Sequence, residues 1–334
     1  MTLNRIYFAV LIIWISACGS SKSEIPITSE PIVKKKIEHF NIIFAPDLSN
    51  RVISEIRPKP VEDTQIILDF IRNVERVLTY KRNQNQYDIY SFDFINKNLI
   101  SRFNVDLDAM RLDFSIFDNR QIERIDYLRN RSSIKTFDSD LQRFESELKK
   151  VYTSAEKDNY GADIYSYLNS LSQSNLGKDL NEFEYQNVVY QGVYRNILII
   201  FTDGYIEAGL YGDEGCKDGN QCYYLSSNKI SEFRKAYKDS GEISIENFFL
   251  KNNYGIVPVN NPVLTEFEVL VLEINDRSLD VAGNATVHPK DYEIIKLFWS
   301  DWLQKSGVKK FDILPISSSK DLAQKNILEF LGIK

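Results

Sequence analysis

The stretch NIIFAPDLSNR (residues 41–51) joins a run of apolar residues to a short polar sequence. Its first half is rich in β-branched and aromatic side chains and shows no polar alternation, which predicts a strand over residues 40–45 that is buried on both faces. Asp47 and Ser49 follow at once. A carboxylate and a hydroxyl therefore stand at the point where a buried strand ends.

The stretch NILIIFTDG (196–204) repeats this arrangement later in the chain. Residues 196–202 form the clearest buried-strand pattern in the sequence. Asp203 comes directly after this strand, and Gly204 permits a tight turn there. Each of the two strands thus ends at an acidic side chain.

The rest of the chain alternates between strand-like and helix-like patterns. Strands are predicted over 87–94, 267–274 and 310–316, helices over 61–78, 137–152, 163–171, 228–238, 291–305 and from a Ser319 cap onward, and an inserted loop or hairpin over 173–194. Alternating strands and helices form a parallel sheet, and right-handed crossovers make it doubly wound. We therefore expect an α/β fold with a doubly wound, mostly parallel central sheet, helices on both faces, and insertions.

The two acidic strand ends predict a ligand site. In a doubly wound sheet, ligands bind outside the carboxyl ends of the strands, where the strand order reverses. If the two strands are neighbours at that point, Asp47, Ser49 and Asp203 converge. Two carboxylates and a hydroxyl repel one another unless a hard cation joins them, and oxygen ligands with open positions suit Mg²⁺ or Mn²⁺. These three residues are therefore candidate metal ligands.

This arrangement resembles a von Willebrand factor type A (VWA) domain, whose metal-ion-dependent adhesion site has three motifs. They are Asp-x-Ser-x-Ser after the first strand, a Thr in a loop that opens a helix, and an Asp, usually before Gly, after the fourth strand. The chain has DLSNR at 47–51, GADIYSYL at 161–168 and FTDG at 201–204, in the same order. The resemblance covers residues 39–334. It implies a Rossmann-type fold, metal ligation by the three residues above, and a partner carboxylate that completes the coordination of the ion.

Two positions depart from the VWA pattern. Arg51 stands where the first motif has its second hydroxyl, and Ala162 stands where the Thr is expected. Asp163, next to Ala162, is a candidate substitute ligand. Arg51 is a candidate site-modulating residue, because its guanidinium can pair both carboxylates without any metal. Two alternatives are open: a degenerate Mg²⁺ or Mn²⁺ site, and a salt-bridged site with no cofactor.

The first residues have the features of a bacterial secretion signal. Arg5 precedes an apolar run over residues 6–15, which is too short to cross a ~30 Å hydrocarbon core as a helix and fits the apolar region of a signal peptide. The run ends in Ile-Ser-Ala-Cys, which resembles the lipobox of bacterial lipoproteins. This resemblance implies that residues 1–17 are removed and that Cys18 carries the lipid.

Residues 18–38 are expected to form a lipidated cysteine followed by a flexible tether. They are rich in serine, proline and lysine and lack apolar periodicity. Gly19, directly after the cysteine, resembles lipoproteins that are sent on to the outer membrane. We expect the VWA-like domain, residues 39–334, to be held at that membrane through the lipid, on its periplasmic or its surface face.

Composition narrows the classes of function. The net charge of −6 offers no basic footprint for nucleic acid. The two histidines, His39 and His288, are far apart, which argues against a histidine-rich zinc site and against a serine-histidine-aspartate triad. Outside the cytoplasm, Cys216 and Cys222 close a short loop and are expected to form a disulfide.

These patterns favour a binding module over an enzyme. The leading hypothesis is an envelope-anchored lipoprotein whose VWA-like domain binds an envelope or extracellular protein. One alternative is a metal-assisted envelope hydrolase in which Asp47 acts as nucleophile or metal ligand. The other is a structural lipoprotein that assists assembly of an envelope machine and needs no ion.

Overall fold

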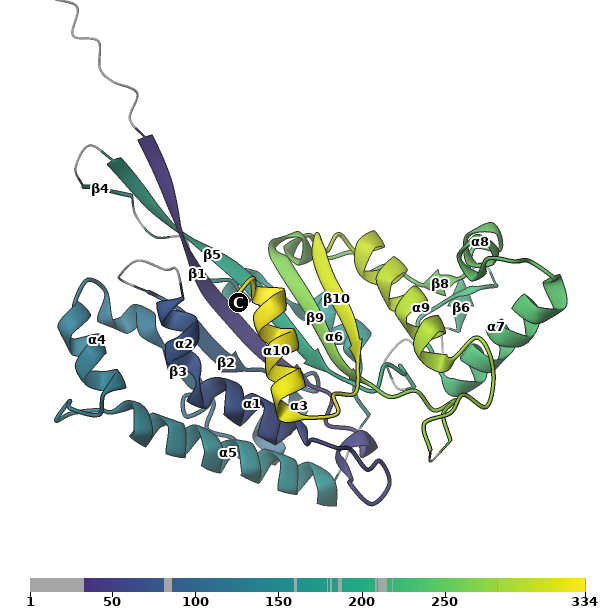
Figure 1. The fold of residues 1–334 in the computed structure, drawn as a ribbon, viewed down its shortest axis with the longest axis horizontal. Coiled ribbons are helices and arrows are strands. Elements are labelled where there is room, and N and C mark those ends of the chain that lie inside the picture. The colour runs from purple at the N-terminus through teal and green to yellow at the C-terminus, as the bar shows by residue number, and fades with distance from the viewer. Residues whose placement is uncertain are drawn as a thin grey trace, which may run out of the picture.

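The structure is a computed structural model (Figure 1). It describes residues 33–80, 86–158, 161–178, 180, 182–185, 188–207, 209, 215–217, 219–280 and 282–333. The predicted signal peptide, Cys18 and the first part of the predicted tether lie outside the described residues. Among the residues that the structure describes, no helix combines the length and apolar character required to cross a membrane.

A mostly parallel central sheet organises the fold. Its strands lie in the order β10-β9-β5-β1-β2-β3, with β4 added to β5. β3 is antiparallel to β2, and β4 is antiparallel to β5, whereas the other pairs are parallel. The bounds are β1 Val33–Pro46, β2 Ile89–Phe92, β3 Arg111–Asp113, β4 Phe183–Tyr185, β5 Val188–Phe201, β9 Phe267–Ile274 and β10 Lys310–Pro315. The mixed α/β class and the mostly parallel sheet agree with the sequence prediction.

Both faces of the central strands are buried, which explains their unbroken apolar sequence. Along β1, Ile42 and Phe44 point into one hydrophobic core, and Ile43 and Ala45 point into the other. The strands β5 and β9 divide their side chains between the same two cores. A strand that is solvated on one face would instead show alternating polar residues.

Helices cover both faces of the sheet (Figure 1). On the first face lie α1 Asp63–Arg72, α2 Val74–Thr79, α3 Asn98–Arg102, α4 Gln121–Leu128, α5 Phe137–Lys157 and α10 Lys320–Leu331. On the second face lie α6 Ile164–Ser170, α7 Ser227–Ser240, α8 Ile245–Lys251 and α9 Asp291–Lys305. The predicted helix over 61–78 is two helices, which meet at Asn73. The Asp69 carbonyl accepts both the Asn73 side chain, at 2.7 Å, and the Asn73 amide, at 3.2 Å.

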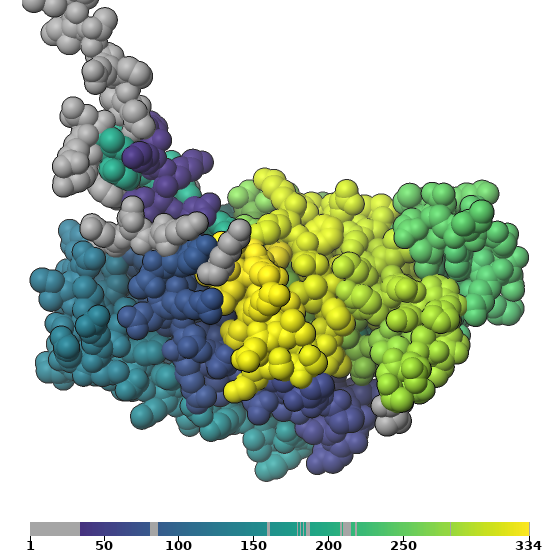
Figure 2. Space-filling view, viewed as in Figure 1, coloured from purple at the N-terminus to yellow at the C-terminus, as the bar shows by residue number. Residues whose placement is uncertain are grey.

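The domain begins earlier than residue 39. β1 starts at Val33 and pairs with β5 from Val33–Val188 to Pro46–Phe201. The last residues of the predicted tether are therefore strand, and the inserted segment 173–194 contributes the β4–β5 hairpin and the first half of β5. This part of β1 projects from the body of the molecule, so most of its side chains are exposed and polar (Figure 2). It therefore lacks the apolar run by which a buried strand is predicted from sequence.

The cysteine loop is a small covalent hairpin. Cys216 and Cys222 form a disulfide and face each other in the antiparallel pair β6 Cys216–Lys217 and β7 Gln221–Cys222. β7 also pairs with β8 Gly255–Ile256. The disulfide prediction is confirmed. Trp299 and Trp302 lie on α9 and are buried in the second core.

Ile200→Ala tests how much stability the two-sided burial of β5 provides. Ile200 is 0% exposed, so truncation removes buried methyl groups and leaves a cavity in the centre of the sheet. We expect the free energy of unfolding to fall by about 2–5 kcal/mol, measured by urea denaturation. Ile122→Ala is the matched control, because Ile122 is 77% exposed on α4, and it should change stability by less than about 0.5 kcal/mol. Equal losses in the two variants would contradict this account of the core.

Candidate functional site

The two strands that end at acidic side chains are neighbours. The strand order reverses between β1 and β5, since β2 and β3 extend the sheet on one side and β9 and β10 on the other. The last pair in register is Pro46 with Phe201, and the Asp47 amide donates to the Phe201 carbonyl at 2.8 Å. The loops after the two strands therefore lie side by side at the reversal point, where open α/β sheets bind ligands.

A crevice of about 210 Å³ opens at this point. It is lined by Asp47, Ser49, Asn50, Gly161, Ala162, Asp203, Tyr205, Glu207 and Arg277. All three stretches that carry the VWA resemblance contribute to it. The remaining lining residues come from the loop after β5 and the loop after β9.

Asp47 is a buried carboxylate held by neutral donors. It is 3% exposed, and it accepts the Ser49 amide at 2.9 Å and the Thr202 hydroxyl at 3.2 Å. Burial raises the pKa of the Asp47 carboxyl; Arg51 opposes the rise, and the charge of Asp203 adds to it. Within the described ranges, no lysine or arginine side chain forms an ion pair with Asp47.

Asp203 is held by an arginine. Arg277 Nη2 donates to Asp203 Oδ2 at 2.7 Å, and Arg277 Nη1 donates to Glu207 Oε1 at 2.9 Å and to Ser227 Oγ at 2.6 Å. The guanidinium also lies 3.7 Å from the centre of the Tyr205 ring. Arg277 thus carries a fixed positive charge into the crevice.

For two charged groups in the crevice, the ion pairs shift the pKa more than burial does. Burial by itself would lower the pKa of Arg277, but Asp203 and Glu207 raise it above the ordinary value. Burial by itself would raise the pKa of Glu207, but hydrogen bonds and charge from Arg277 lower it. Both groups are therefore charged at neutral pH.

Sequence reasoning missed Arg277, although the sequence contains a signal for it. Arg277 follows β9 in the order NDRS, and β9 was predicted as a strand. Because β9 is parallel to β5 and lies beside it, its carboxyl end reaches the same edge of the sheet. Asp47 and Asp203 were selected because ligands bind outside the carboxyl ends of parallel strands. The same reasoning applies to the loop after β9.

Arg51 does not pair the two carboxylates of the crevice. Its guanidinium makes two hydrogen bonds to Asp63, at 2.6 and 3.1 Å, on the opposite side of the loop. Arg51 Nη1 also donates to the backbone carbonyl of Asp47 at 3.1 Å. Arg51 therefore supports the Asp47 loop from beneath. The alternative in which Arg51 pairs both carboxylates is therefore not the arrangement in the structure, since its ion-pair partner is the buried Asp63. Arg51 still acts on Asp47, through the carbonyl and by opposing the rise in the pKa of the Asp47 carboxyl.

Asp163 acts as a helix cap. Its carboxylate accepts the Ser166 amide at 2.9 Å and the Ser166 hydroxyl at 2.6 Å at the start of α6. Asp163 is not among the residues that line the crevice, whereas its neighbour Ala162 is, and Ala162 brings no oxygen. Asp163, the candidate substitute for the missing Thr, therefore lies outside the described lining of the crevice.

These residues do not fit a resident Mg²⁺ or Mn²⁺. Asp203 Oδ2 is bound by Arg277, so Asp47 and Ser49 are the expected ligands that remain. In the described part of the chain, no group of three or more His, Cys, Asp or Glu side chains is arranged to hold a metal. Mg²⁺ requires a nearly octahedral set of oxygens, which the two residues supply only in small part.

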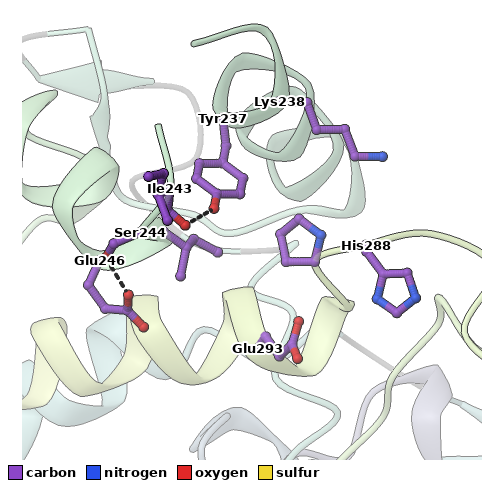
Figure 3. A pocket seen from close by; sticks show the side chains of 9 residues that line it. Tyr237, Lys238, Ile243, Ser244, Glu246, His288 and Glu293 are labelled. Atoms are coloured by element: carbon purple, nitrogen blue, oxygen red, sulfur yellow. Dashed lines mark hydrogen bonds between the residues drawn. The ribbon is translucent and has the colours of Figure 1, made fainter. Parts of the chain in front are cut away.

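A second cavity, of about 510 Å³, lies between α7, α8 and α9 (Figure 3). Its acidic side chains serve local structure: Glu246 accepts the Ser244 hydroxyl at 2.7 Å, and Glu293 accepts the Lys290 amide at 2.8 Å as a helix cap. Tyr237 donates to the Ile243 carbonyl at 2.8 Å. None of these groups converges on a common point, so the crevice remains the stronger candidate.

Glu273, near the end of β9, is a buried acid that sequence reasoning also missed. It is 1% exposed, its Oε1 accepts the Ser317 amide at 3.2 Å, and its Oε2 has no hydrogen-bond partner among the described residues. Burial and the charge of Asp63 raise the pKa of Glu273 to about 7, against opposing effects of Ser317, Lys59 and Arg51. A glutamate that follows the apolar run 269–272 within the predicted strand was the available signal.

No family model matches the chain, and no curated protein or solved structure matches it. Function is therefore inferred from the placement of the side chains described above.

Asp63→Asn tests whether the buried ion pair supports the Asp47 loop. The substitution leaves the buried Arg51 and Lys59 without their shared carboxylate. Loss of one partner from a buried pair should lower the free energy of unfolding by about 3–5 kcal/mol, measured by urea denaturation. Glu123→Gln is the matched control, because Glu123 pairs with Arg120 in solvent; its loss should stay below about 1 kcal/mol. A loss of that small size in Asp63→Asn would contradict the structural importance of the pair.

Glu273 predicts a pH dependence of stability. The unfolded chain releases this proton near pH 4.5, whereas the folded chain keeps it until about pH 7. Between these values the folded state binds more protons, so the free energy of unfolding falls as pH rises, in total by about 3 kcal/mol. Glu273→Gln cannot titrate and should become more stable than the natural chain, by up to that amount, between pH 5 and pH 8. Urea denaturation at several pH values checks this, and parallel profiles for the two chains would refute it.

Proposed function

We propose that this protein is a lipid-anchored binding module of the bacterial envelope whose VWA-like, doubly wound domain binds a partner protein through the crevice. The observation that carries this proposal is the meeting of residues 47–51, 161–162 and 201–204 around one cavity at the reversal point of the sheet. In the resembled family, the corresponding loops form the adhesion site. The strand order, with the antiparallel strand at one edge, agrees with a Rossmann-type topology.

The anchoring part of the proposal rests on residues 1–19. A signal peptide over 1–17 and lipid on Cys18 would hold the chain at a membrane, and Gly19 favours the outer membrane. Anchoring at this end puts the membrane on the side where β1 begins (Figure 1). The crevice lies at the other end of the same 14-residue strand, roughly 45 Å away at the rise of an extended chain. Such an anchored domain would present the crevice away from the lipid.

The hydrolase alternative has less support from the contacts in the crevice. A nucleophilic carboxylate or an activated water needs a general base in hydrogen-bond reach. His39 packs against Tyr87 and Tyr194, and His288 lies at the second cavity, so neither imidazole lines the crevice. The ion-free assembly lipoprotein is the second candidate, and the Asp203–Arg277 pair favours it. It differs from the leading hypothesis only in needing no ion.

Site-specific photo-crosslinking in intact cells tests the binding proposal. A photoreactive residue at Asn50, in the crevice, should give a discrete adduct with an envelope protein, and Asp47→Ala should remove most of that adduct by reshaping the crevice. The same photoreactive residue at Glu329, which is exposed on α10, is the control. An identical adduct from both positions, or an Asn50 adduct that survives Asp47→Ala unchanged, would contradict binding through the crevice.

Cell fractionation tests the anchoring part separately. Cys18→Ala should move the protein from the outer-membrane fraction to the soluble or inner-membrane fraction, because no lipid can be attached. Unchanged fractionation would contradict lipid anchoring and leave the crosslinking result unaffected.

A further inference from the structure

The carboxyl of Glu273 is buried and only partly hydrogen-bonded. Its Oε1 accepts the Ser317 amide at 3.2 Å, and its Oε2 has no hydrogen-bond partner among the described residues. The buried Ser317 hydroxyl and the buried Nε of Arg51 also have no partner in the described part of the chain. Buried polar groups in proteins are usually hydrogen-bonded, so this carboxyl requires an explanation.

The backbone of Glu273 is strained. Its φ is 70°, in the left-handed region that disfavours residues with a Cβ atom. The other non-glycine residues with positive φ in the described ranges are all Asn or Asp, whose short polar side chains tolerate this conformation. A strained residue persists only where the surrounding structure fixes it. Contacts around Glu273 must therefore hold its backbone in place.

Hydrogen bonds to the second loop of the crevice supply these contacts. The Thr202 amide donates to the Leu272 carbonyl at 3.0 Å, and the Asn275 amide donates to the Asp203 carbonyl at 3.1 Å. Glu273 lies between Leu272 and Asn275 in the chain, so bonds to the loop that carries Asp203 flank it on both sides. A change in the backbone at Glu273 would therefore move that loop.

The side chain of Glu273 faces the charges that support the first loop of the crevice. Asp63 on α1, Lys59 before α1 and Arg51 after β1 all act on its carboxyl. Arg51 and Lys59 share Asp63 as their ion-pair partner, at 2.6 and 2.8 Å. Arg51 also donates to the Asp47 carbonyl at 3.1 Å. The same arginine thus links the surroundings of Glu273 to the Asp47 loop.

Glu273 is the member of this network that changes its charge near neutral pH. Burial alone would raise the pKa of Asp63, but Arg51 and Lys59 lower it below its ordinary value. Tyr152 on α5 donates to Asp63 at 3.2 Å, and burial raises its pKa well above the ordinary value. Burial and the charge of Asp63 raise the pKa of Glu273 to about 7. Two cations therefore share one carboxylate at lower pH, and a second carboxylate competes for them at higher pH.

We propose that Glu273 is a proton switch that sets the positions of both crevice loops. Its protonated form stabilises the arrangement described above. When Glu273 releases its proton to water, its unpartnered Oε2 becomes an anionic acceptor, and the unpartnered Nε of Arg51 is the donor that it draws. Movement of Arg51 weakens the bond to the Asp47 carbonyl, and movement of Glu273 shifts the bonds to the Asp203 loop.

This inference adds a regulation to the proposed function, and it rests on that function only in treating the crevice as the binding site. The switch acts in the free protein, so it can be tested without any partner. A pH titration of the free chain can fail while crosslinking at Asn50 succeeds, and the reverse result is equally distinguishable.

The experiment is a fluorescence pH titration of the full-length chain labelled at one position. Asn50 is exposed and lines the crevice, so Asn50→Cys places an environment-sensitive fluorophore on the first loop. Cys18→Ala in every labelled chain leaves the introduced cysteine as the only free thiol, because the other two cysteines form the disulfide. We expect the emission to titrate with a midpoint near the pKa of Glu273, about 7.

Glu273→Gln removes the titrating group and should abolish this transition. His39 and His288 are present in both chains, so its loss assigns the transition to Glu273. Glu329→Cys, labelled in the same way on the exposed side of α10, is the matched control for the label and should show no transition near pH 7. The control separates movement of the crevice loop from a general effect of pH on the fluorophore.

Lys59→Met is the second variant. The charge of Lys59 favours the ionised form of Glu273, so its loss should move the midpoint to higher pH, by roughly one pH unit. Thermal unfolding reports whether each variant folds. A flat profile in the natural chain labelled at Asn50, or the same transition in folded Glu273→Gln, would overturn the inference. If Glu273→Gln did not fold, an unchanged midpoint in folded Lys59→Met would overturn it.

Discussion

The parallel pairing of β1 with β5 is the constraint on which the rest of the structure depends. The register runs without a break from Val33–Val188 to Pro46–Phe201. Because the pair lies in the middle of the sheet, its apolar half is buried on both faces and holds the two hydrophobic cores together. Because the pairing is parallel, both carboxyl ends reach the same edge, and the loops that carry Asp47 and Asp203 must emerge next to each other.

Two arginine–aspartate pairs then decide the shape of the loops at that edge. Arg51 pairs with Asp63 beneath the first loop, and Arg277 pairs with Asp203 beside the second. Buried charges are costly unless they are paired and hydrogen-bonded. Each arginine pairs with a buried carboxylate and so compensates the cost of burying both charges. Apolar side chains of the same loops, Leu48 and Val52 in the first and Tyr205 and Ile206 in the second, also pack into the two cores.

The same long strands separate the two ends of the molecule. The start of β1 projects from the body together with the first half of β5 (Figure 2). The crevice opens beyond the last residues of both strands. An anchor that precedes β1 and a binding site that follows it would therefore act at opposite ends of one rigid element. This geometry suits a module that is attached at one end and makes contact at the other.

The sequence by itself determined the features that depend on local pattern. Unbroken apolar runs predicted the strands before Asp47 and Asp203, close cysteine spacing predicted the Cys216–Cys222 disulfide, and helical periodicity predicted the helix α9. These signals are local because burial on both faces, loop closure and helical repeat each involve residues near one another in the chain.

Only the tertiary structure decided which charged side chains meet. Arg51 turns to Asp63, Asp163 caps α6, and Arg277 reaches Asp203 from a loop after another strand. These partners are set by strand order and by the cost of leaving a buried charge unpaired. Strand order and the cost of an unpaired charge cannot be read from the spacing of residues along the chain. The crevice could therefore be located from the sequence, but the arginine that pairs with Asp203 could not.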